Sequence, residues 1–163
     1  MATKTVLHHP NQQLRKHSAP CTKDEILHED MQAFVNDMID TMKIENGVGL
    51  AAPQVDKHIR LIICETDNGP EAYFNPEIIK VSTGMRDSEE GCLSVPNVYG
   101  VVRRHKQVKV QALNRHGEPV SIKARGLLSV IFQHEIDHLD GVLFIDRAHK
   151  IHDLTKEKER EIL

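Results

Sequence analysis

The stretch GLLSVIFQHEIDHL, Gly126–Leu139, is apolar around most of its circumference when it is drawn as a helix. A helix that is apolar on all sides is normally buried, so the stretch predicts a central buried helix. It contains HEIDH, His134–His138, whose two histidines are four residues apart and would therefore lie on one helix face. This spacing lets a helix supply two imidazoles to one metal ion, and Glu135 would lie at the edge of the same site.

The histidine pair has a simpler interpretation, because the chain has 11 histidines and a pair four apart could arise by chance. The apolar surroundings of this pair argue against it. Two histidines and a carboxylate on a buried helix cost several kcal/mol unless a partner compensates them, and a metal ion would do so. A catalytic metal ion needs a third protein ligand and one position left open for water.

The third ligand is not decided by the residues alone. In the zinc-protease pattern H-E-x-x-H-x-x-G-x-x-H, Gly141 is in place, but Phe144 occupies the position of the third histidine. Glu157 and Glu159 are downstream candidates in a charged run that is typical of a solvated surface. Cys92, in the glycine-containing segment EEGCLSVP, is an upstream candidate, although a free cysteine is more often a small core residue.

A glycine-containing segment, NGVGLAAPQ, ends at Gln54. It lacks the third glycine of the dinucleotide fingerprint and the Gly-Lys-Ser/Thr of a phosphate loop, so it does not predict nucleotide binding. The amide of Gln54 could donate to an oxyanion. Taken by itself, the segment favours a simpler interpretation, a tight turn after the helix followed by a surface glutamine.

The rest of the chain predicts an α+β fold, with antiparallel or mixed β-sheets around the central helix. A stripe that includes Leu27, Met31 and Phe34 predicts an amphipathic N-terminal helix over 21–47, with a capping box at Thr22. The stretch RLIICET predicts a buried strand, and alternating residues over 107–124 predict a β-hairpin. The charged tail HDLTKEKEREIL, 152–163, predicts a C-terminal surface helix.

Length and composition restrict the class of protein. The 163 residues predict a single domain over residues 1–163. A net charge of -3 and 4% aromatic residues argue against direct nucleic-acid binding. We expect no membrane span and no signal peptide, because the apolar runs are too short. Three unpaired cysteines favour a reducing compartment, so we expect a cytoplasmic protein.

Three ordered motifs together resemble the peptide deformylase family: GVGLAAPQ, EGCLS and QHEIDH. The segments VLHHPNQQLRKHSAP and DGVLFID are also similar, so the resemblance covers nearly the whole chain except its last ten or so residues. The resemblance implies hydrolysis of the formyl group from the N-terminal formyl-methionine of new polypeptides, with the ribosome as the place of action. It implies one divalent metal ion per chain, held by Cys92, His134 and His138. Family members commonly use Fe²⁺, and the ligand set also suits Zn²⁺, Ni²⁺ or Co²⁺.

The same resemblance implies catalytic roles for Glu135, as general acid–base, and for the Gln54 amide and the Leu93 backbone N–H, as oxyanion donors. It also implies substrate contacts, although the apolar members of this set could equally be ordinary core. These residues are Val48, Gly49, Leu127, Val130 and Ile131.

Two further positions matter for the comparison with the family. Tyr99 stands where some relatives carry an arginine that contacts the peptide, and Glu90 with Arg104 matches a supporting ion pair. The rival hypotheses are a zinc endopeptidase of the His-Glu-x-x-His type and a structural Cys-His-His metal site in a binding module. A structural site normally closes with a fourth protein ligand, and none stands out in the sequence.

Overall fold

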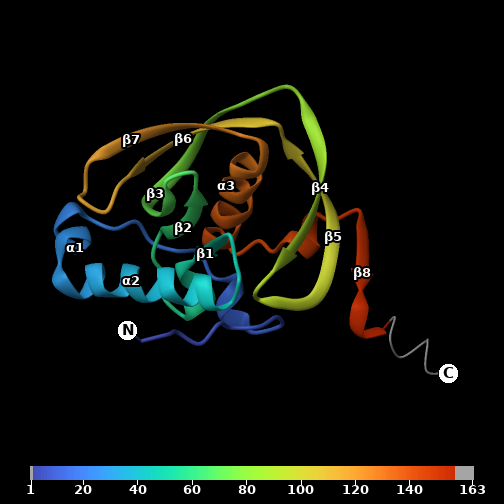
Figure 1. Cartoon of the computed structure of the whole chain (residues 1–163), viewed down its shortest axis with the longest axis horizontal. Helices are drawn as coiled ribbons and strands as arrows, with labels where there is room; N and C mark the ends of the chain where they lie inside the picture. The colour runs from blue at the N-terminus through green and yellow to red at the C-terminus, as the bar shows by residue number, and fades with distance from the viewer. Residues whose placement is uncertain (1, 157–163) are drawn as a thin grey trace.

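The central helix α3 (Gly126–Leu139) has the predicted bounds and the predicted burial. In the computed structural model, which describes residues 2–156, α3 lies between two antiparallel sheets (Figure 1). From Ser129 to Leu139 every residue of α3 is buried except Asp137. The prediction of a buried helix at the centre of an α+β fold is therefore confirmed.

The larger sheet has five strands, and each neighbouring pair is antiparallel. Its order is β1 (Gly49–Ala51), β2 (Leu61–Thr66), β3 (Gly69–Val81), β6 (Gln107–Leu113) and β7 (Pro119–Arg125). The predicted hairpin is the β6–β7 pair, in which Val110 lies opposite Ile122. The smaller sheet contains β4 (Met85–Cys92), β5 (Val95–His105) and β8 (Lys150–Asp153).

Strand β2 explains how the two layers of core are joined. Leu61 and Ile63 pack into a cluster with helix α2 (Glu29–Ile44), whereas Ile62 and Cys64 pack into a cluster with α3. Successive side chains of a strand point to opposite faces, so a strand that is buried on both faces must be apolar throughout. The continuous apolar run of this segment has that cause, and the predicted buried strand is confirmed.

The predicted N-terminal helix over 21–47 is wrong in its continuity. The chain forms α1 (Lys23–Leu27) and then α2, and the break falls at His28, whose backbone is extended. The capping box between Thr22 and Glu25 forms as predicted. His28 in turn caps α2, because its ring accepts a hydrogen bond from the Asp30 N–H. The break turns Leu27 out of the apolar stripe, and its side chain is 49% exposed.

The predicted C-terminal helix over 152–163 begins too early. His152 and Asp153 belong to β8, which pairs with β5. Of the described part of this tail, 152–156, residues 154–156 have helical conformation. The rest of that prediction, 157–163, lies outside the described residues. The remaining short helices are η1 (Gln12–Arg15), η2 (Ala52–Val55) and α4 (Phe144–Arg147).

Within residues 2–156, no helix has the length and apolar character needed to cross a membrane.

Candidate metal centre and active site

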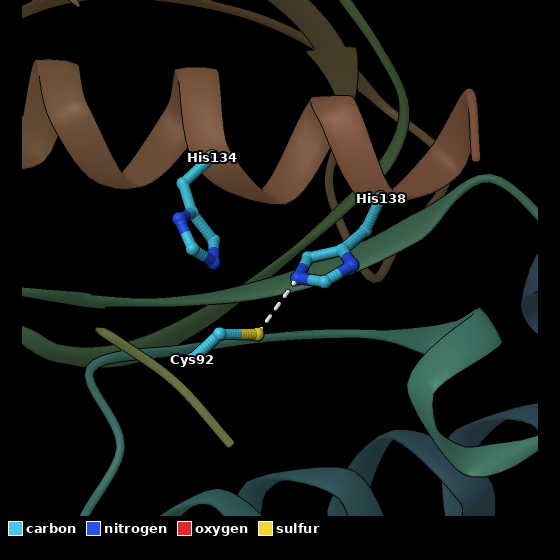
Figure 2. A group of neighbouring side chains, drawn as sticks. All are labelled: Cys92, His134 and His138. Carbon is cyan, nitrogen blue, oxygen red and sulfur yellow. Dashed lines mark hydrogen bonds between the residues drawn. The ribbon is translucent and has the colours of Figure 1, made fainter. Parts of the chain in front are cut away.

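Three potential metal ligands from two distant parts of the chain meet beside α3. His134 and His138 project from one face of the helix toward Cys92, the last residue of β4 (Figure 2). Their ligand atoms all lie within 4.8 Å of one another, and Cys92 Sγ is 3.3 Å from His138 Nε2. The structure therefore brings together the three residues that the sequence singled out.

The end of β4 directs Cys92 into this cluster. Cys92 is the last residue of this strand, and the pairing with β5 shifts register between Gly91 and Cys92. A side chain at position 91 would clash with Tyr99, because a Cβ there would lie 2.9 Å from the Tyr99 ring. The glycine thus lets Tyr99, which is 43% exposed, cover the strand beside the thiol.

A carboxylate orients the first histidine. Glu90 Oε1 lies 2.7 Å from His134 Nδ1, so Nδ1 carries the proton and Nε2 keeps its lone pair for a metal ion. Arg104 donates two hydrogen bonds to Glu90, at 2.8 and 2.9 Å. Burial raises the pKa of Glu90, and the hydrogen bonds from Arg104 and His134 outweigh it, so the net pKa lies below the ordinary value.

The network continues outward through residues that the sequence analysis missed. Arg104 Nη1 also donates to Asp137 Oδ2 at 2.7 Å, and Asp137 accepts two hydrogen bonds from Arg147 of α4. Asp137 points away from the histidine face, as helical spacing requires. The alternating positive and negative side chains of this network neutralise the buried Glu90 and hold it against His134. The spacing of Asp137 and Arg104 in the sequence gives no signal that they meet.

The second histidine, His138, is buried and favours its uncharged form. Burial lowers the pKa of His138 well below its usual value, and the positive charge of Arg104 acts in the same direction. Neutral imidazole is the form that binds metal ions. Among the described residues, His138 Nδ1 has no hydrogen-bond partner. A cysteine sulfur with two imidazoles is a donor set that divalent transition metals accept, so the residues present fit the metal ion that the resemblance implied.

Glu135 is the buried carboxylate of the site. Its side chain is 5% exposed, and its Oε2 has no hydrogen-bond partner among residues 2–156. Burial is the main cause that raises the pKa of Glu135 to about 7. Gly49 of β1 lies directly against it, because a Cβ at Gly49 would be 2.8 Å from Glu135 Cδ. The carboxylate can therefore hold or release a proton near neutral pH.

The Gln54 side chain is fixed within η2, and the interpretation of Gln54 as a surface residue is wrong. Its Oε1 accepts a hydrogen bond from the Ala51 N–H at 2.8 Å. Its Nε2 lies 3.1 Å from Ser94 Oγ and 3.5 Å from Cys92 Sγ, so the amide N–H groups face the metal-ligand cluster. Leu93 lies in the turn between Cys92 and Ser94.

The expected substrate-contact residues divide into two groups. Val130 and Ile131 of α3 are buried, and Ile131 packs into the cluster between α3 and the larger sheet. Val48 and Leu127 are 47% and 63% exposed, so they are not core residues. Phe144, which replaces the third histidine of the protease pattern, is buried with its ring 6.1 Å from that of His134. Glu157 and Glu159 lie outside the described residues.

The fold and this Cys-His-His site with its buried carboxylate define a metal-dependent hydrolase. A family model described as polypeptide deformylase matches residues 3–154. The peptide deformylase of Tolumonas auensis is 46% identical over 149 residues, which cover 90% of this chain and 87% of that protein.

Two solved structures are similar over almost their whole length. The peptide deformylase of Thermotoga maritima has a TM-score of 0.86 at 39% identity, covering 91% of this chain and 99% of that chain. The Met-Ala-Ser-bound peptide deformylase of Acinetobacter baumannii has a TM-score of 0.85 at 36% identity, covering 90% and 98%.

The chain belongs to the peptide deformylase family. It is a metal-dependent hydrolase that removes the formyl group from the N-terminal formyl-methionine of polypeptides, and it uses one divalent metal ion. The comparisons do not favour the endopeptidase or the structural-site alternative.

Proposed function

We propose that Cys92, His134 and His138 hold the metal ion and that Glu135 moves the protons of deformylation. The observation that supports this most strongly is the meeting of the three ligand atoms within 4.8 Å beside a buried carboxylate. When bound, the divalent ion would make a water molecule easier to deprotonate and would polarise the formyl oxygen.

The protein's own groups carry the remaining steps. Glu135 accepts a proton from the attacking water as the water oxygen bonds to the formyl carbon. The negative charge that develops on the formyl oxygen is met by the Gln54 amide and the Leu93 backbone N–H. Glu135 then gives the proton to the peptide nitrogen, the carbon–nitrogen bond breaks, and formate and a free amine leave. A pKa of about 7 suits both halves of this cycle.

Substrate recognition in this proposal uses the apolar residues around α3. Leu127, Val130 and Ile131 share a helical face with His134 by spacing. Gly49, the first residue of β1, lies against Glu135, and Val48 directly precedes it. They would hold the methionine side chain and the adjacent backbone. The similar structure from Acinetobacter baumannii has Met-Ala-Ser bound, which supports recognition of a peptide that begins with methionine. Tyr99, beside Gly91, would contact the following residues of the peptide.

The metal ion that we propose for the enzyme in the cell is Fe²⁺, and Zn²⁺, Ni²⁺ and Co²⁺ also suit one thiolate with two imidazoles. Anaerobic purification followed by elemental analysis tests this: a dominant metal other than iron would contradict it. We further propose a single catalytic domain over residues 1–163 that acts in the cytoplasm on new polypeptides at the ribosome. The free thiols of Cys21, Cys64 and Cys92 support a reducing compartment.

The proposed function is tested by comparing three peptides with the metal-loaded enzyme. These are formyl-Met-Ala-Ser, acetyl-Met-Ala-Ser and a longer peptide without a formyl group. A pocket fitted to the smallest acyl group should disfavour one added methyl by about 10–200-fold in kcat/KM. Rapid formate release from the first peptide, much slower acetate release from the second and no cleavage of the third support the proposal. Comparable cleavage inside the unformylated peptide would contradict it.

A further inference from the structure

Three lysines form a row across the larger sheet. In the strand register, Lys80 of β3 lies opposite Lys109 of β6, and Lys109 lies opposite Lys123 of β7. Neighbouring strands are about 4.8 Å apart, so the row spans about 10 Å. We call Lys80, Lys109 and Lys123 the lysine row. Within residues 2–156, none of the three takes part in an ion pair or a side-chain hydrogen bond.

The lysine row lies on a part of the sheet that no helix covers within the described residues. Val108, Val110 and Ala124 face α3, so their neighbours Lys109 and Lys123 point to the opposite face. On that face α2 packs against β1, β2 and β3, and it reaches the β6–β7 hairpin at its turn end, where Arg115 donates hydrogen bonds to Gln32 and Asn36. The lysine row lies toward the other end of the hairpin. The cations are therefore accessible to a large partner.

A hollow of about 360 Å³ lies at the lysine row. Arg125 of β7 adds a fourth cation to its lining, and we call the lysine row together with Arg125 the basic hollow. The other lining residues are Val81, Ser82, Gln107, Val108 and Ala124. Toward the hairpin turn, the next row whose side chains share this face, Glu77–Gln111–Ser121, contains one acid, which forms no ion pair with the lysines among the described residues.

The basic hollow does not serve the stability of the fold. Like charges directly opposite each other on neighbouring strands are destabilising. The whole chain has a net charge of -3, so four cations that have no ion-pair partner within residues 2–156 are a local concentration of positive charge. An arrangement that opposes folding and remains accessible points to an anionic partner that neutralises it.

We infer that the basic hollow binds the phosphate backbone of RNA. A row of cations about 10 Å long can follow successive phosphates of one strand. The hollow has no aromatic lining residue on which a base could stack, so binding would be independent of sequence. A concave surface receives a protruding nucleic-acid backbone better than it receives a flat membrane. The whole-chain charge argued against nucleic acid, but it does not report how the cations are placed.

The position of the basic hollow relates it to deformylation, and this step rests on the proposed function. Arg125 is two residues before Leu127, which is at most about 7 Å along the chain. Leu127 is one of the proposed methionine contacts. RNA held at the basic hollow would therefore lie close to the entrance for the substrate, as expected for an enzyme that meets new polypeptides at the ribosome.

The test measures binding of a fluorescent RNA hairpin of about 20 nucleotides to the metal-loaded enzyme between about 50 and 200 mM KCl. Each neutralised phosphate contributes about −0.7 to −0.9 to the slope of log K against log salt concentration, so four contacts give a slope of about −3. The triple variant Lys80→Gln/Lys109→Gln/Lys123→Gln should have a slope of about −1 and an affinity about 100-fold lower at 0.1 M KCl.

A matched control removes the same charge elsewhere. Lys16, Lys43 and Lys150 are exposed and lie outside the basic hollow, and their triple glutamine variant should bind the hairpin as the unaltered enzyme does. Removing the lysine row should leave the melting temperature unchanged or raise it, because like charges are separated. The single variant Lys123→Gln should lower the slope by about 0.7–0.9, which keeps the test available if the triple variant does not fold.

The outcomes separate this inference from the proposed function. Equal binding by the row variant and its control would overturn the inference and leave the lysines as solvated residues of the sheet face. Binding to phosphatidylserine vesicles without RNA binding, or displacement by inorganic phosphate at constant ionic strength, would also overturn it. Turnover of formyl-Met-Ala-Ser should be the same in all variants. Absence of that activity in the unaltered enzyme would contradict the proposed function and would not contradict RNA binding at the basic hollow.

Discussion

The contact between Gly49 and Glu135 gives a prediction that can be worked from the structure. A Cβ at position 49 would lie 2.8 Å from Glu135 Cδ and 2.9 Å from Cγ, whereas carbon atoms pack at about 3.5 Å or more. Gly49→Ala must therefore displace the carboxylate by about 0.7 Å. A displacement of about 1 Å at reacting groups can cost about 10²-fold, so we expect kcat to fall by about 10–100-fold.

The assay is steady-state hydrolysis of formyl-Met-Ala-Ser, with metal content and thermal unfolding measured on the same preparation. Metal content should not change, because the substitution does not touch Cys92, His134 or His138. Overpacking should lower the unfolding free energy by about 1–3 kcal/mol. Gly84→Ala is the control, since its Cβ would meet only the flexible Lys106 side chain, at 3.3 Å. Normal turnover in Gly49→Ala would refute the claim that the position of Glu135 limits the rate.

Three further predictions concern the ligands and the charges. Cys92→Ala should lose the metal ion, while Cys21→Ala, in the core, should keep it; full metal content in Cys92→Ala would reject the thiolate ligand. Arg104→Met leaves the buried Glu90 carboxylate without its cation, and it should lower the free energy of unfolding by about 3–5 kcal/mol in chemical denaturation. Hydrogen bonding from Arg15 lowers the pKa of Asp146 in the folded protein below its value of about 3.9 in the unfolded chain. The pair therefore stabilises the fold fully above about pH 3.9, and this stabilisation is lost as the pH falls through the folded-state pKa. Asp146→Asn should therefore cost about 0.2–1 kcal/mol at neutral pH, and the difference should shrink below about pH 4.

The sequence predicted the parts of the fold whose cause is local. The apolar circumference of Gly126–Leu139 required a buried helix, and the alternation over 107–124 required a hairpin with one solvated face. The break at His28 was not predictable from the apolar stripe, because the stripe continues through it. Strand β4 reads MRDSEEGC, and such a charged segment gives no strand pattern; it is an edge strand, where charge is tolerated.

The site was predictable to a similar degree. The spacing of His134 and His138 indicated two ligands on one face, and the motif around Cys92 suggested the third. The contacts that orient the ligands depend on long-range packing. Glu90 reaches His134 across 44 residues of sequence, and Asp137 reaches Arg104 across 33. Only the three-dimensional structure shows that these charges form one network.

The substitution Glu135→Gln tests the central claim most directly, because it keeps the shape of the side chain and removes its ability to carry a proton. Metal content and turnover of formyl-Met-Ala-Ser should be measured on the same sample. We predict close to one metal ion per chain, retained peptide binding, and a turnover lower by at least about 10²–10⁴-fold. Loss of the metal ion would identify Glu135 as a ligand, and retained turnover would show that another group moves the protons; either result would contradict the account.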